Sequence, residues 1–292
     1  MSWHRFLRNK YGKGDSVTGI DRIRQIFQEN TTGLRCMTHA VGGWPDMETS
    51  EAILCAMIDA GADILEIQLP FSDPAADGSM IVAANHQALA NGATTKKILA
   101  MIGRVRRHAD TRAGGGVTSI LVMSYLNPVL AYGEHAFVQD ASEVGVDGFI
   151  IPDCPPDEKD MLPEISSAAG LAFVPLIAPD TDDARMEMIC RRFISPLVYA
   201  VLRYGVTGRK SVIDAGTKKY LERIQRVTGR ALAAGFGIRE RDQVEALQGV
   251  VDCFVAGSVF ISTVTDAIAS GKSPAEAVQK HIVALQGQDQ NG

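Results

Sequence analysis

The chain has 292 residues, of which 46% are hydrophobic, and its 34 acidic and 29 basic residues leave a net charge of −5. This nearly balanced charge gives no reason to expect a nucleic-acid partner, and no apolar run approaches the ~18 residues that a membrane span needs. The length suits one α/β barrel, a fold that often uses roughly 200 to 250 residues as a single unit.

The chain begins with a basic segment. Its first thirteen residues include four Arg and Lys residues and no acidic residue, and no apolar stretch follows that would make a secretory signal. We therefore predict a flexible basic extension over residues 1–17, a folded unit over 18–287 and a short tail over 288–292.

Short apolar segments alternate with longer amphipathic ones along the folded unit. Strands are predicted at 34–39, 64–69, 118–123, 148–152, 172–177, 197–201, 231–235 and 252–256. Helices are predicted at 20–29, 47–60, 95–109, 134–144, 158–169, 183–193, 218–228, 240–248, 259–270 and 274–286. Eight strands, each followed by a helix, predict a single parallel (β/α)₈ TIM barrel with an extra N-terminal helix.

The second predicted strand carries a carboxylate inside an apolar run. Glu66 is flanked by Ile64, Leu65, Ile67 and Leu69, which is typical of a strand buried on both faces. A carboxyl held in such a dry place has a raised pKa and can donate a proton near neutral pH.

Asp77 follows Glu66 by eleven positions, on a loop rich in turn-forming residues. One carboxylate on a strand and another on the following loop suit general acid–base chemistry. The alternative is structural: Glu66 pairs with a buried base, while Asp73 and Asp77 only form turns.

Glycines follow three consecutive predicted strands near the end of the chain. The segments are 205–208, 235–237 and 257–258. Since TIM barrels commonly bind phosphate at the last strand ends, and glycine lets the backbone approach an anion, we predict a phosphate site. Its residues would be Gly208, Gly237, Gly257 and Ser258.

Cysteine and histidine spacing gives no support for a metal site. The five cysteines include no C-x-x-C pair, and none of the six histidines is four positions from another. Unpaired cysteines fit a reduced cytoplasm. His39 alone falls at the end of a predicted strand, where packing is favoured over a catalytic role.

Several motifs occur in a fixed order from about residue 20 to residue 270. They are 66–78 after the second predicted strand, 123–128 after the third, 146–158 after the fourth, 205–208 after the sixth, 235–238 after the seventh and 257–258 after the eighth. As a set they resemble the tryptophan synthase α chain family, although each short piece is unspecific.

The resemblance implies a retro-aldol cleavage of indole-3-glycerol phosphate to indole and glyceraldehyde 3-phosphate, without metal or organic cofactor. It implies that Glu66 protonates C3 of the indole ring and shuttles the proton of the glycerol hydroxyl, while Asp77 stabilises positive charge at the indole N–H. Tyr199 matches a family tyrosine near the substrate, and Tyr125 and Asp153 match residues at the mouth of the site. Tyr199 could equally be a core tyrosine.

The resemblance also implies a protein partner. The family's α chain docks on a β chain, in an α2β2 type of assembly, through the loops after the second and third strands. Pro70, Asp73, Pro74 and Asn127 match those positions. Pyridoxal phosphate is expected only on the β chain.

Some residues depart from the family pattern. Gln68 replaces a glycine two positions after Glu66, and strand alternation places it on the same face. We expect its amide to bond to Glu66, Tyr125 or a nearby backbone group and to narrow the pocket. Ser79 and Tyr204 are further departures. Two other functions therefore stay open: a stand-alone lyase that releases free indole, and a non-catalytic barrel that binds and activates a β chain.

Overall fold

The computed structural model describes residues 17–28, 33–112, 116–157, 161–201, 214–235 and 237–287. Within them, nine parallel strands form one sheet in the order β5-β4-β3-β2-β1-β9-β8-β7-β6. The strands are β1 (Arg35–Val41), β2 (Ile64–Gln68), β3 (Ser119–Met123), β4 (Gly148–Ile150), β5 (Ala172–Phe173), β6 (Leu176–Ile177), β7 (Leu197–Ala200), β8 (Ala231–Gly235) and β9 (Cys253–Ala256).

The sheet closes through one predicted strand that the structure divides. β5 pairs with β4 and β6 pairs with β7, so the two ends of the strand order are successive pieces of segment 172–177. Pro175 lies between them and has no N–H to donate to a ladder. Its carbonyl accepts a hydrogen bond from the Tyr199 N–H at 2.9 Å, which continues the contact with β7. The predicted TIM barrel is confirmed, with its fifth strand in two pieces.

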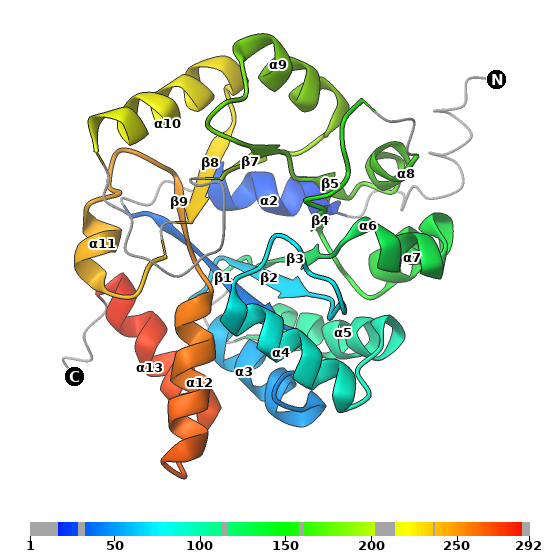
Figure 1. Cartoon of the computed structure of the whole chain (residues 1–292), viewed down its shortest axis with the longest axis vertical. Helices are drawn as coiled ribbons and strands as arrows, with labels where there is room; N and C mark the ends of the chain where they lie inside the picture. The colour runs from blue at the N-terminus through cyan, green and yellow to red at the C-terminus, as the bar shows by residue number, and fades with distance from the viewer. Residues whose placement is uncertain are drawn as a thin grey trace.

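Helices surround the strands on the outside of the barrel, as Figure 1 shows. They are α2 (Gly19–Gln28), α3 (Met47–Asp59), α4 (Ser79–Ala90), α5 (Thr95–Thr111), α6 (Leu126–Tyr132), α7 (Glu134–Glu143), α8 (Leu162–Ala168), α9 (Asp183–Arg192), α10 (Ala215–Thr228), α11 (Arg241–Glu245), α12 (Ser258–Ala269) and α13 (Pro274–Gln286). None of the helices in the described ranges is long and apolar enough to cross a membrane.

Two of these helices are absent from the sequence prediction. α4 starts after Gly78, which has no side chain to cap it, and its apolar residues are spread around the helix rather than gathered on one face. α6 is short and contains Pro128, a residue that usually indicates a turn. Neither helix has the caps and periodicity on which the prediction of a helix rests.

Two layers of apolar side chains hold the barrel together. One lies between the sheet and the outer helices and includes Leu65 and Ile67 of β2. The other fills the barrel interior and includes Ile64 of β2, together with Ile23 and Ile26 of α2. This alternation along β2 puts Glu66 and Gln68 on the interior face with Ile64.

α2 is fixed across the barrel by the buried Asp147. This carboxylate forms ion pairs with Arg22 of α2 and Arg106 of α5 and also accepts a hydrogen bond from the Ile120 N–H at 2.7 Å. Gly19 permits the close approach, because a Cβ there would lie 2.3 Å from the Asp147 carbonyl oxygen. Asp147 thus links three elements below the functional end of the barrel.

Candidate active site

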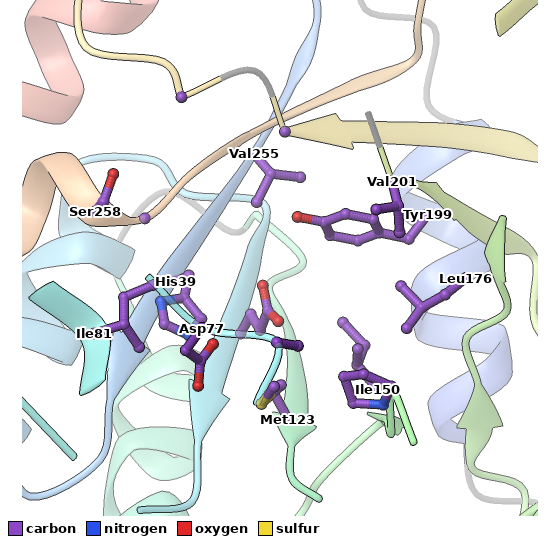
Figure 2. Close-up of a pocket in the computed structure, with 16 residues that line it drawn as sticks. His39, Asp77, Ile81, Met123, Ile150, Leu176, Tyr199, Val201, Val255 and Ser258 are labelled. Carbon is purple, nitrogen blue, oxygen red and sulfur yellow. The ribbon is translucent and has the colours of Figure 1, made fainter. Parts of the chain in front are cut away.

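A cavity of about 230 Å³ opens at the carboxyl ends of the strands. Its wall is mostly apolar and includes Ile81, Met123, Ile150, Leu176, Val201 and Val255. Polar groups enter it from His39, Glu66, Asp77, Tyr199 and Ser258. Figure 2 shows His39 and Asp77 on one side of this cavity and Tyr199 reaching in from the opposite side. An apolar cavity with a few convergent polar groups is the usual form of a small-molecule site.

Glu66 lies in the middle of β2 and is only 6% exposed. Burial raises the pKa of its carboxyl, and the nearby Asp77 adds to this effect while His39 opposes it. No residue in the described ranges makes a hydrogen bond with this carboxyl. The expectation of a buried carboxyl with a raised pKa is confirmed. The alternative, in which Glu66 pairs with a buried base, is not supported, since no base in the described ranges forms a hydrogen bond or ion pair with this carboxyl.

Asp77 is held at the cavity wall by two donors. The Gln68 side-chain amide donates to Oδ2 at 2.5 Å, and the Tyr125 hydroxyl donates to the same oxygen at 3.2 Å. Burial and Asp77 raise the pKa of Tyr125, so this hydroxyl keeps its proton and remains a donor. The backbone N–H of Asp77 donates to Pro74 O at 3.0 Å, which closes the turn of the loop.

Tyr199 lies opposite, on β7. Burial raises the pKa of its hydroxyl above the ordinary value, and the neighbouring Glu66 raises it further. A Cβ at Gly235 would lie 3.0 Å from this hydroxyl oxygen, so the glycine leaves room for the ring. Tyr199 is therefore a cavity residue and not only a core tyrosine.

Gln68 differs from the expectation. Its side chain is fully buried and does not line the cavity. Its amide bonds to His39 and Asp77, rather than to Glu66, Tyr125 or the backbone. The predicted partners are wrong because the β1–β2 register places Gln68 two residue pairs beyond His39, on the same face of the sheet and within reach of its ring. Gln68 therefore lies outside the cavity and holds two of its lining residues in place through hydrogen bonds.

His39 is the residue that sequence reasoning undervalued. It is 7% exposed, lines the cavity and pairs in register with Glu66 on the next strand. The sequence placed it at the end of a predicted strand, whereas β1 continues to Val41. Its proximity to Glu66 depends on the strand register, which a single sequence does not specify.

Glycines line the other end of the cavity. Gly235 ends β8 and Gly237 follows it, while Gly257 and Ser258 follow β9 at the start of α12. Gly237 has φ +63°, a left-handed conformation that favours glycine. The structure brings together three of the four predicted phosphate residues, while Gly208 lies outside the described residues.

Tyr125 and Asp153 do not line this cavity. Asp153 is exposed and accepts a hydrogen bond from the Leu126 N–H at 2.9 Å, at the start of α6. Of the predicted partner positions, Asp73 and Asn127 are exposed, Pro70 is half-buried and Pro74 is buried. Ser79 is exposed at the start of α4, and Tyr204 lies outside the described residues. No cluster of metal-binding side chains occurs in the ranges that the structure describes.

The family model described as "Tryptophan synthase alpha chain" matches residues 25–290. The chain belongs to this family. The tryptophan synthase alpha chain of Gluconacetobacter diazotrophicus is 41% identical over 243 residues, which cover 83% of this chain and 86% of the relative. That of Caulobacter vibrioides is 40% identical over 262 residues, or 88% and 92% of the two chains.

Solved structures agree with the sequence comparison. The tryptophan synthase alpha chain from Legionella pneumophila superposes with a TM-score of 0.80 at 26% identity, covering 92% of this chain and 97% of that one. An aminoacrylate-bound form of tryptophan synthase from M. tuberculosis gives 0.77 at 25% identity, covering 91% and 98%. The chain is therefore a member of a lyase family with a TIM-barrel fold, and the resemblance noted in its motifs is confirmed.

Proposed function

We propose that the chain cleaves indole-3-glycerol phosphate to indole and glyceraldehyde 3-phosphate. The observation that carries this proposal is Glu66, a buried carboxyl with a raised pKa and no hydrogen-bond partner in the described residues, inside an apolar cavity. A carboxyl kept neutral in this way can deliver a proton to an aromatic carbon. The apolar wall suits an indole ring.

Each polar group then has a role. Glu66 protonates C3 of the indole ring, and Asp77 accepts a hydrogen bond from the indole N–H, where positive charge develops. The two donors to Asp77 fix the direction of its carboxyl group. Tyr199 keeps its proton and contacts the substrate from the opposite wall.

The phosphate binds at the first turn of α12. The N–H groups at the start of this helix and the positive end of the helix dipole favour an anion there. Ser258 adds a hydroxyl, and Gly237 and Gly257 leave space for the phosphate oxygens. Gly208 belongs to this proposed site as well. No metal and no organic cofactor has a part in these steps.

The direct test is indole release from indole-3-glycerol phosphate by the purified chain. Glu66→Gln should lower kcat by at least ~10²-fold while binding of a phosphate-bearing analogue is kept. Asp77→Asn should also lower kcat, through lost charge stabilisation. A wild-type chain that binds the analogue but releases no indole would favour the non-catalytic alternative.

We further propose a cytoplasmic location and a tryptophan synthase β chain as partner, with pyridoxal phosphate on that β chain. Five free cysteines in the described residues support a reducing compartment. The contact with the β chain would form on or beside the loops around the cavity mouth, at Pro70, Asp73, Pro74 and Asn127. Of these four residues, Asp73 and Asn127 are exposed. Co-elution with a β chain, lost on Asn127→Arg but not on Gln139→Arg at exposed α7, would support this surface. Indole release without any such association would favour a stand-alone lyase.

A further inference from the structure

The direction of the Gln68 amide is fixed by its partners. A carboxylate only accepts hydrogen bonds, so the oxygen of Asp77 must face the NH₂ group of Gln68, at 2.5 Å. The amide oxygen of Gln68 then faces His39 Nε2, at 2.9 Å. Because an amide oxygen only accepts, Nε2 of His39 carries a proton.

This arrangement leaves the other ring nitrogen of His39 without a partner. In the neutral ring with a proton on Nε2, Nδ1 is an acceptor. Nδ1 is buried and has no hydrogen bond in the described part of the chain. Leaving a buried acceptor unsatisfied destabilises the folded state, so an unpaired nitrogen in a cavity wall calls for an explanation.

The position of Nδ1 supplies that explanation. On one side of His39 lies Glu66, its register partner on β2. On the other side lies Gly257, where an added Cβ would be 3.3 Å from Nδ1. His39 thus stands between the proposed proton donor and the first turn of α12, where the phosphate would bind. A substrate whose ring meets Glu66 and whose phosphate meets the first turn of α12 would therefore carry its three-carbon chain past His39.

We propose that His39 is a catalytic residue whose Nδ1 takes the proton from the hydroxyl next to the indole ring, so that acid and base are two separate groups. This inference rests on the proposed function and deepens it. It assigns the proton from the glycerol hydroxyl to His39 in place of Glu66. Gln68 is then a positioning residue that holds the ring in the required tautomer.

The step balances in atoms and electrons. Glu66 gives its proton to C3 of the ring, and the ring nitrogen takes up the positive charge. The hydroxyl proton passes to His39 Nδ1, the bond between C3 and the hydroxyl-bearing carbon breaks, and its electron pair returns to the ring. A C=O bond forms on the departing aldehyde. Glu66 is left as a carboxylate and His39 as an imidazolium, and transfer of one proton between them restores both.

The test compares three variants for indole release and folding. His39→Asn keeps a hydrogen-bonding group near the position of Nδ1 but cannot take up a proton, and His39→Phe removes both properties. His108→Asn is the matched control, since His108 lies on α5 at the surface and pairs with Asp59. We expect kcat to fall by at least ~10²-fold in both His39 variants, with KM changed far less, and to stay at the wild-type value in the control.

The tautomer gives a second readout that does not depend on activity. Nitrogen-15 NMR of the resting enzyme should show the proton of His39 on Nε2, and Gln68→Met should abolish this preference. A proton on Nδ1 in the wild type overturns the proposal, as does wild-type kcat in folded His39→Asn. If the wild-type chain releases no indole, the proposed function fails and the role of His39 fails with it. An active wild type with an active His39→Asn variant overturns only the role of His39.

Discussion

Replacing Gln68 with methionine should lower the rate of indole release. The buried Gln68 amide joins His39 at 2.9 Å and Asp77 at 2.5 Å, so it fixes two polar residues that line the cavity together with Glu66. Methionine has a similar length and volume but offers no comparable donor or acceptor. The substitution removes both hydrogen bonds without leaving a large cavity.

The size of the effect follows from the two lost bonds. A hydrogen bond to a charged group contributes about 1.5 to 3 kcal/mol, and a neutral one about 0.5 to 1.5 kcal/mol. We therefore expect the free energy of unfolding to fall by about 2 to 4.5 kcal/mol. If the bond to Asp77 is fully used in the transition state, its loss lowers kcat by ~10- to 10²-fold.

Indole release at saturating substrate measures kcat, and urea unfolding measures stability and confirms that the variant is folded during the assay. Gln139→Met is the matched control, since Gln139 is exposed on α7 and its side chain bonds to the neighbouring Glu143 at 3.1 Å, away from the cavity. Turnover equal to or above the wild-type rate would refute the argument and favour the sequence-based expectation that Gln68 obstructs the pocket. Gln68→Gly, which that expectation makes faster, should be slower than Gln68→Met because it also leaves a cavity.

Three further predictions follow from the site and its support. Because burial raises the pKa of Glu66, its neutral form persists to higher pH than that of an ordinary glutamate. The value of kcat/KM should therefore fall as the pH rises through this raised pKa. A fall within the ordinary glutamate range would contradict the role of Glu66 as the proton donor. Gly237→Val should raise KM strongly for the phosphorylated substrate and far less for its dephosphorylated form, because the side chain fills the anion space and strains a φ of +63°. Asp147→Ala should lower the free energy of unfolding by about 3 to 5 kcal/mol in urea titrations, since it removes the buried carboxylate that pairs with both Arg22 and Arg106; a change below ~1 kcal/mol would refute its structural role.

The barrel could be predicted because its strands are short apolar runs at regular spacing. The segments at 34–39, 64–69 and 118–123 match β1, β2 and β3 closely, since a strand buried on both faces requires such a run. The division at Pro175 was less visible, because the apolar run continues through it. α4 was missed for the opposite reason: its helix is stabilised by contacts with β1 and α12 rather than by a local pattern.

The site was predictable where one residue is unusual in its own segment. Glu66 contrasts with the apolar residues around it, so its burial could be expected from the sequence. The partners of Gln68 could not, because they depend on the register between β1 and β2 and on how the loop folds back to bring Asp77 near Gln68. A single sequence gives the face of a strand on which a side chain lies, but not the groups that meet it there.

His39 and Gln68 depend on one another. With a smaller residue at position 68, Nε2 of His39 would be a buried donor without its present partner, and Asp77 would lose its shorter hydrogen bond. With an apolar residue at position 39, the amide oxygen of Gln68 would be left unpaired in a fully buried place. Either residue without the other leaves a buried polar group unpaired, which destabilises the fold. Together they form a chain of hydrogen bonds that ends on the carboxyl group of Asp77. Gln68 and His39 therefore form a matched pair, and His39 faces the cavity in which we propose that the substrate reacts.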